Sequence, residues 1–229
     1  MMQDALIVSA AGGLLCLDRV LIQVLLSRPI VAAPIIGLLL GDPFTGLIVG
    51  AFIELIWIDR LPIGGYLPPN DTITSILTTA SAIGSGRLLG GLSPGLIALA
   101  VLIFIPFGMI AQRMDVWIVM GNERLSRGAL DDAARGDCRA IARKHLLAVL
   151  KTFLLSALLI LITLPAGIGV ITWVYPRLPA SILRGLTLVY ASLPLIGAAA
   201  ALNAIRSRGT LPIFCAAFLT ATVILGLLG

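Results

Sequence analysis

Long apolar runs constrain this chain more than any other feature of its sequence. Five predominantly apolar runs of about 20 residues or more lie at 5–26, where Asp18-Arg19 interrupts the run, and at 92–111, 146–173, 185–204 and 210–228. A helix needs about 20 apolar residues to span the hydrocarbon core, and only helices and closed barrels satisfy their backbone there. Charged residues make up 12% of the chain, against about 25% in a soluble domain. The sequence therefore predicts an all-α, polytopic membrane protein.

After the run at 5–26, which we expect to form a first helix, come apolar runs that are too short to span a bilayer. Two of them, at 30–41 and 46–58, flank the turn sequence Gly41-Asp42-Pro43, and a third run at 72–83 is rich in Thr and Ser. An irregular stretch with prolines and a Gly-Gly pair occupies 61–71. Non-helical backbone at membrane depth is tolerated only where protein or a water-filled cavity covers it. We therefore expect re-entrant helical hairpins or broken helices in this region.

A single long polar segment interrupts the apolar field at residues 112–151. It holds eight of the sixteen Lys and Arg residues, and the positive-inside rule assigns it to the cytoplasm. Asp131, Asp132, Arg135 and Arg139 recur at helical spacing within it. We expect a cytoplasmic helical hairpin whose charges are mostly solvated. No basic patch is interleaved with aromatic residues, so nucleic-acid binding is not expected.

Carboxylates inside apolar runs are candidates for function. Glu54 lies between apolar residues on both sides, where an ionised side chain costs about 2.5 to 3.5 kcal/mol at a helix centre. It could instead pair with a cation such as Arg28 or Arg60, or lie at the interface. Asp42 has an alternative role as an ordinary turn residue.

Further polar candidates follow the irregular stretch. Asn70 and Asp71 close it, and Thr72 and Ser75 come directly after. Carboxylates and amides hydrogen-bond well to the vicinal hydroxyls of sugars, but they could equally hold a cation or relay protons. These residues predict a polar site at membrane depth whose ligand the residue types alone leave open. The three cysteines lack metal-ligand spacing, so no metal or other cofactor is expected.

The segment from Arg28 to Ala80 resembles a known family, the IIC component of the mannose-fructose-sorbose class of the bacterial phosphotransferase system. The matching positions, in order, are Arg28-Pro29, Leu40-Gly41-Asp42, Thr45-Gly46, Gly50, Glu54, Ile63-Gly64 and Pro69-Asn70. The stretch from Ala129 to Gly136 is similar to a further segment of the family. The order and spacing of these short patterns carry the resemblance.

The resemblance implies a function and a set of partners. A IIC chain pairs with a IID membrane subunit, and together they carry a sugar inward while phospho-IIB, charged through IIA, phosphorylates it. IIC itself carries no phosphorylated residue and no catalytic residue. The family assembles as trimers of IIC–IID units in the bacterial cytoplasmic membrane. Glu54 and Asn70 would contact sugar hydroxyls, and Asp42 would shape the hairpin.

Our hypothesis from the sequence is a hexose permease subunit, a single integral-membrane domain over residues 1–229 with its substrate segments at about 28–84. The predicted substrate-binding residues are Asp42, Glu54, Asn70, Asp71, Thr72 and Ser75. Two alternatives remain at this point. An ion-coupled secondary transporter would use Glu54 and Asp42 as its ion site, and a regulatory subunit of the same fold would not transport at all.

Overall fold

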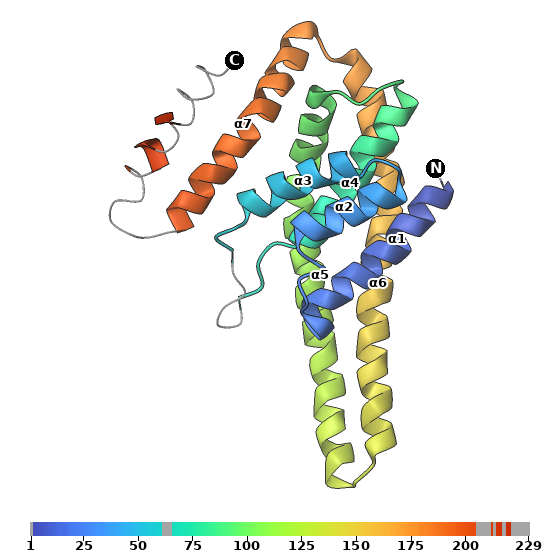
Figure 1. Ribbon diagram of the computed structural model, residues 1–229. Helices are drawn as coiled ribbons and strands as arrows, with labels where there is room; N and C mark the ends of the chain where they lie inside the picture. Colours follow the sequence, from blue (N-terminus) through green and yellow to red (C-terminus); the bar gives the residue numbers. More distant parts are fainter. Residues whose placement is uncertain (1, 61–65, 205–211, 213, 217–218, 221–229) are drawn as a thin grey trace.

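The computed structural model describes residues 2–60, 66–204, 212, 214–216 and 219–220, and these residues form helices joined by short turns, with no strand among them. The main helices are α1 (Met2–Leu17), α2 (Pro29–Leu39), α3 (Pro43–Ile56), α4 (Asp71–Leu88), α5 (Pro94–Ala134), α6 (Cys138–Val174) and α7 (Ala180–Ala204). Figure 1 shows α5 and α6 as two long neighbouring rods with the shorter helices packed on their upper parts. The predicted all-α class is confirmed.

Among the residues that the structure describes, four helices are long and apolar enough to cross a membrane. They are Met2–Ile22, Pro94–Ala134, Cys138–Arg177 and Ala180–Leu202. The first of them continues α1 through a π-helical turn, Asp18–Ile22. The expected run at 210–228 lies largely outside the described residues. The polytopic character of the chain therefore rests on α1, α5, α6 and α7.

The two short apolar runs form the expected hairpin of α2 and α3. Proline begins each helix, Pro29 in α2 and Pro43 in α3, where its missing N–H loses no helical hydrogen bond. Gly41 adopts φ +79° in the turn between them. With 11 and 14 residues, the two helices are about 16 and 21 Å long, shorter than the hydrocarbon core of about 30 Å.

Glycines on α3 allow its close approach to α2. A methyl group at Gly46 would overlap the carbonyl oxygen of Ala33, and one at Gly50 would overlap the carbonyl oxygen of Pro29. The two glycines are four residues apart, so they share one face of α3. Gly46 and Gly50, which are part of the family resemblance, therefore form the surface of α3 that packs against α2; we call this contact the α2–α3 seam.

The Thr- and Ser-rich run becomes α4, which is the buried centre of the fold. Every residue from Thr72 to Gly86 except Gly84 is buried, and α4 packs on α1, α2, α3, α5 and α6. Several of its hydroxyls donate to carbonyls one turn earlier in α4, as Thr78 does to Thr74 at 2.7 Å. At membrane depth such hydroxyls can either satisfy backbone groups or line a polar path, and these bonds satisfy backbone carbonyl groups.

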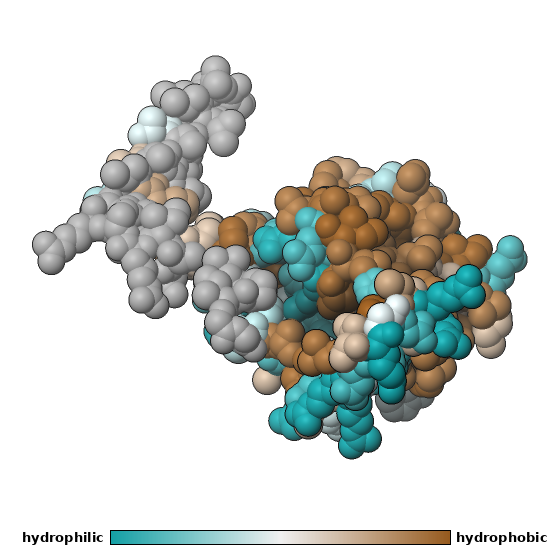
Figure 2. Space-filling view, turned by 90° about the horizontal axis from the view of Figure 1, so that it is seen from below, coloured by the Kyte–Doolittle hydropathy of each residue, from teal (hydrophilic) through white to brown (hydrophobic). Residues whose placement is uncertain are grey.

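The polar segment 112–151 consists of the lower halves of α5 and α6 and the turn between them; we call it the polar hairpin. At 41 residues α5 is about 60 Å long, twice the thickness of the hydrocarbon core, so both helices extend well beyond the apolar body. Asp132 accepts hydrogen bonds from Lys144 and from Arg135, and these bonds hold the pKa of Asp132 below its usual range. Seen from its end, the hairpin presents hydrophilic side chains beside a broad hydrophobic surface (Figure 2).

Candidate functional site

The irregular stretch before α4 is held by side chains from distant helices. Residues 66–70, which we call the site loop, are not helical, and Pro68 and Pro69 offer only carbonyl groups to the surroundings. Arg19 donates to the carbonyl oxygens of Pro68 and Pro69 at 3.2 and 3.4 Å. Gln112 of α5 donates to the carbonyl oxygen of Leu67. The broken backbone is therefore satisfied by protein groups, as membrane depth requires.

An ion pair ties the end of the first helix to the start of α4. Arg19 Nη1 donates to Asp71 Oδ1 at 2.9 Å, and the two side chains are only 18% and 24% exposed. Arg19 belongs to the π-helical turn, while the adjacent Asp18 accepts from Val24 N at 2.8 Å and from Ser27 N at 2.9 Å. Asp18 and Arg19 thus bind different segments, Asp18 the turn before α2 and Arg19 the start of α4, because successive residues of a helix point about 100° apart.

A second ion pair closes the open end of the α2–α3 hairpin. Arg28, just before α2, donates to Glu54 in the last turn of α3. Pairing with Arg28 was one of the alternatives that the sequence left for Glu54. The pair does not remove Glu54 from the candidate site, because Arg28 also lines the cavity beside the site loop.

This cavity has a volume of about 420 Å³, within the range of small-molecule sites. Its charged lining comes from separate segments, namely Asp18 and Arg19 of the π-helical turn, Arg28 before α2, Arg60 after α3 and Asp71 of α4. The polar groups Gln23 and Ser27 also line it. We call it the site cavity. Its walls combine donors and acceptors around a space large enough to hold a monosaccharide.

The structure gathers five of the six predicted site residues near this cavity, but in different layers. Asp71 lines it directly, and Glu54 reaches it through Arg28. Asn70, Thr72 and Ser75 are buried behind it, with exposures of 1%, 0% and 0%. Asn70 caps α4 by accepting from Ile73 N at 2.9 Å.

The hydroxyls of this buried layer bond to backbone carbonyls. Thr72 donates to the carbonyl oxygen of Ser27 at 2.7 Å, and Ser75 donates to that of Thr72 at 2.9 Å. Thr72 thereby ties α4 to the segment before α2, whereas Ser75 bonds within α4. Thr72 therefore supports the cavity wall at Ser27, and neither Thr72 nor Ser75 lines the cavity.

Asp42 lies at the other end of the α2–α3 hairpin. Its carboxylate caps α3, accepting from Thr45 N at 3.0 Å and from Thr45 Oγ1 at 2.6 Å. It lines a separate cavity of about 430 Å³ with Gly41 and Arg87. The expectation that Asp42 shapes the hairpin agrees with this cap, and the structure does not bring Asp42 to the site cavity.

Replacing Asp42 by alanine is expected to lower the free energy of unfolding by about 1 kcal/mol, the usual effect of removing a helix cap. Asp42→Asn keeps the accepting oxygen and is expected to lose much less. Thermal unfolding of the purified protein in detergent measures both. Equal losses in the two variants would contradict the capping role.

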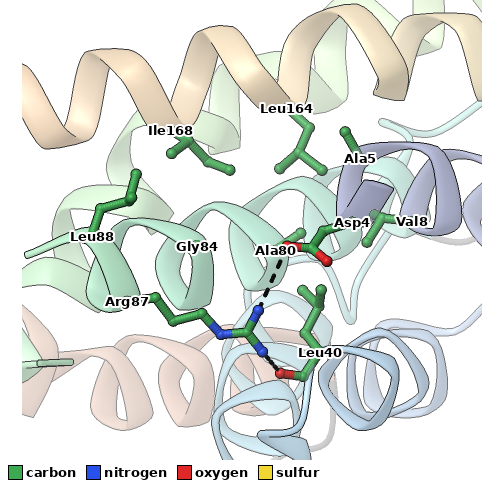
Figure 3. A pocket seen from close by; sticks show the side chains of 10 residues that line it. All are labelled: Asp4, Ala5, Val8, Leu40, Ala80, Gly84, Arg87, Leu88, Leu164 and Ile168. Carbon is green, nitrogen blue, oxygen red and sulfur yellow. Dashed lines mark hydrogen bonds and ion pairs between the residues drawn. The ribbon is translucent and has the colours of Figure 1, made fainter. Parts of the chain in front are cut away.

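Near Asp42 a second charged centre joins α1, α2 and α4. Arg87 donates to the carbonyl oxygen of Leu40 and lies 3.7 Å from Asp4 (Figure 3). The surrounding pocket is small, about 180 Å³, and otherwise mostly apolar. Asp4 and Arg87 lie at the opposite ends of α1 and α4 from Arg19 and Asp71. Charge pairs therefore fasten α1 to α4 at both ends.

Sequence reasoning missed three side chains of the site, Arg19, Gln112 and Asp115. Asp115 of α5 accepts from Asn70 Nδ2 at 2.9 Å. The signal that could have found Gln112 and Asp115 is their spacing from Gly108, since i, i+4 and i+7 share one helix face. Among the described residues no group of three His, Cys, Asp or Glu side chains is arranged to hold a metal ion.

Comparison with curated proteins identifies several relatives. The chain is 23% identical over 209 residues to the mannose-specific EIIC component of Escherichia coli K12, covering 88% of this chain and 76% of that one. It is 26% identical over 216 residues to the N-acetylgalactosamine permease IIC component 1 of the same organism, covering 94% and 78%. Over 59 residues it is 46% identical to the putative N-acetylgalactosamine permease IIC component 2, covering 26% and 44%.

Solved structures and a family model complete the comparison. The fold matches a chain described as a membrane protein with a TM-score of 0.77 at 22% identity, and a chain of the mannose transporter ManYZ in complex with microcin E492 with 0.65 at 21%. Each match covers 100% of this chain and 92% of the other. The family model described as the sorbose-specific IIC component of the PTS matches residues 1–228. The chain therefore belongs to the sorbose-specific IIC family of the phosphotransferase system, a family of membrane sugar permeases.

Proposed function

We propose that this chain translocates a hexose that phospho-IIB phosphorylates during uptake. It acts in the bacterial cytoplasmic membrane with a IID subunit, and IIA supplies the phosphoryl group to IIB. The whole chain is one integral-membrane domain, and the complex is a trimer of IIC–IID units. The partner is supported by the fold match to a chain of the ManYZ complex.

The observation that carries the proposal is the Arg19–Asp71 pair on the wall of the site cavity. A guanidinium has donors to spare after binding one carboxylate, and a carboxylate has further acceptor positions. Together they suit vicinal hydroxyls, each of which both donates and accepts. Hydrogen bonds to charged groups are about twice as strong as neutral ones, which favours a neutral polyol in a site of this kind.

The pairing pattern favours this reading over an ion-coupled transporter. Glu54 is bound to Arg28 and Asp71 to Arg19, so each carboxylate has a cation beside it. A guanidinium within hydrogen-bond distance repels a metal cation, so the pairing disfavours a cation site at either carboxylate. Asp42, the other residue of the ion-site alternative, is engaged as the cap of α3.

The orientation of the chain follows from charge. The polar hairpin has eight Lys and Arg residues against five Asp and Glu, and short positive segments stay in the cytoplasm. We therefore orient the polar hairpin towards the cytoplasm, on the side where the phosphocarrier proteins are found. The mouth of the site cavity is near the level at which α5 passes into the polar hairpin, since Gln112 contacts the site loop.

The test is phosphoenolpyruvate-dependent phosphorylation of sugars by membrane vesicles that contain this chain, its cognate IID and the soluble phosphotransfer proteins. Mannose, fructose, sorbose and N-acetylgalactosamine form the first panel, from the names of the relatives and of the family model. Activity on one of them is expected, and Glu54→Gln is expected to reduce it by about tenfold or more, because a charge-assisted bond is lost.

Glu123→Gln is the matched control, since Glu123 is exposed and, within the described part of the chain, forms its ion pair with Arg127 one turn later. We expect it to keep the wild-type rate. No activity on any sugar, with the complex intact and the phosphotransfer proteins active, would support the ion-coupled or regulatory alternative instead. Full activity in Glu54→Gln would remove Glu54 from the site.

A further inference from the structure

One face of α5 holds the site loop from behind. Gly108, Gln112 and Asp115 lie at i, i+4 and i+7, and each bonds to a residue of that loop. The carbonyl oxygen of Gly108 accepts from Asn70 N at 2.9 Å. A methyl group at Gly108 would meet Thr74 Oγ1 and a ring carbon of Trp57 at 2.7 and 2.6 Å, so the packing there is close on two sides.

Asn70 is the centre of this contact and is not among the residues that line the site cavity. Its Oδ1 accepts from Ile73 N and its Nδ2 donates to Asp115 Oδ2, both at 2.9 Å. The residue is 1% exposed, while the next residue, Asp71, lines the cavity. The side chains of two consecutive residues are thus divided between support and ligand contact.

We propose that Asp115 is a positioning residue that acts through Asn70 on the carboxylate of Asp71. The inference rests on the proposed function and adds a residue that does not itself touch the sugar. Asp115 Oδ2 accepts from the amide nitrogen of Asn70 and Asn70 Oδ1 accepts from Ile73 N, so the two bonds fix the amide with its nitrogen towards α5 and its oxygen towards α4. That orientation sets the first turn of α4, and the first turn sets the direction in which Asp71 meets Arg19.

In the bond between Asn70 and Asp115 the amide donates and the carboxylate accepts, so exchanging the two residues tests it. Asn70→Asp alone puts two carboxylates within hydrogen-bond distance of each other, and Asp115→Asn alone replaces a charged acceptor by a neutral one. The exchange variant Asn70→Asp/Asp115→Asn restores one amide and one carboxylate with the donor now on α5. Asp at position 70 still accepts from Ile73 N, so the cap of α4 is kept.

The experiment measures the KM and the turnover of sugar phosphorylation by the IIC–IID complex for the wild type, both single variants and the exchange variant. We expect each single variant to raise KM by about tenfold with a change in turnover of less than about twofold, since one charge-assisted bond is altered. The exchange variant is expected to return KM to within about threefold of the wild type. If Asp115 had a purely structural role, its replacement would lower the amount of active complex. The remaining complex would then show an unchanged KM.

Thermal unfolding of the purified complex compares the stability of the same four proteins, the wild type, the two single variants and the exchange variant, without any sugar. Recovery of the midpoint by the exchange variant supports the pairing even where a single variant folds poorly. An active wild type whose exchange variant binds sugar no better than the singles overturns the inference and leaves the proposed function intact. A wild type that phosphorylates no sugar in the panel contradicts the proposed function, and the unfolding cycle then decides whether Asp115 positions Asn70.

Discussion

Replacing Arg19 by methionine is expected to abolish sugar phosphorylation and to lower the stability of the protein. The change removes one ion pair and two hydrogen bonds to the site loop at once. Removing one partner of a buried ion pair costs about 3 to 5 kcal/mol, and we expect about 2 kcal/mol here because Arg19 and Asp71 remain 18% and 24% exposed. Activity is measured in the vesicle assay, and stability by thermal unfolding.

A second change separates the two effects. Arg19→Met/Asp71→Asn removes the carboxylate that the single variant leaves without its guanidinium, so part of the lost stability should return. Phosphorylation should stay absent, because both ligand-facing groups are then gone. Arg127→Met is the control, since Arg127 forms an exposed pair with Glu123 that contributes at most about 0.5 kcal/mol. Normal activity in Arg19→Met would contradict the assigned site.

Replacing Gly46 by alanine is expected to destabilise the protein by about 3 kcal/mol, at the upper end of the usual range for overpacking. The new methyl group would meet the carbonyl oxygen of Ala33 and would lie 2.9 Å from the Cα atom of Pro34. Both are backbone atoms of α2, which cannot rotate away as a side chain can. The helices of the hairpin must therefore separate, and the ion pair between Arg28 and Glu54 at its open end should weaken with them.

The matched control is Gly169→Ala in α6. A methyl group there has nothing within 4 Å in the chain, and alanine is the better helix former by up to about 1 kcal/mol. Thermal unfolding should therefore show an unchanged or higher midpoint for Gly169→Ala and a clearly lower one for Gly46→Ala. Similar midpoints for the two variants would contradict the close α2–α3 seam.

The elements that sequence reasoning found are those whose signals are local. Pro29, the Gly41-Asp42-Pro43 turn and the short apolar runs predict the α2–α3 hairpin, and each signal lies within a few residues of the structure it causes. The regular spacing of charges at 112–151 predicts helices there. Sequence reasoning treated the apolar run at 92–111 and the polar segment as separate elements, whereas α5 crosses from one to the other without a break. A helix can leave the bilayer without ending, because water satisfies polar side chains but does not stop the backbone hydrogen bonding.

The contacts that build the site could not be read from the sequence. Arg19 and Asp71 are 52 positions apart, and Asn70 and Asp115 are 45 apart. Nothing local distinguishes Arg19 from an interfacial charge. The helical spacing of Gln112 and Asp115 from Gly108 places the three on one face but does not show which segment that face contacts. The expected contact of Asn70 with sugar stays a prediction, and its burial between Ile73 N and Asp115 favours an indirect role. The packing of α4 among its neighbours determines that Asp71 lines the cavity while Asn70, Thr72 and Ser75 are buried, and this packing cannot be read from the sequence.

The most direct test of the central claim is an experimental structure of the IIC–IID complex with its sugar bound. The account predicts the sugar in the site cavity, with hydroxyl groups within hydrogen-bond distance of Asp71 and of at least one of Arg19, Arg28 and Glu54. It also predicts that Asn70 keeps its hydrogen bonds to Ile73 N and to Asp115 and does not contact the sugar. A sugar bound instead beside Gly41, Asp42 and Arg87, at the opposite end of the hairpin, would contradict it.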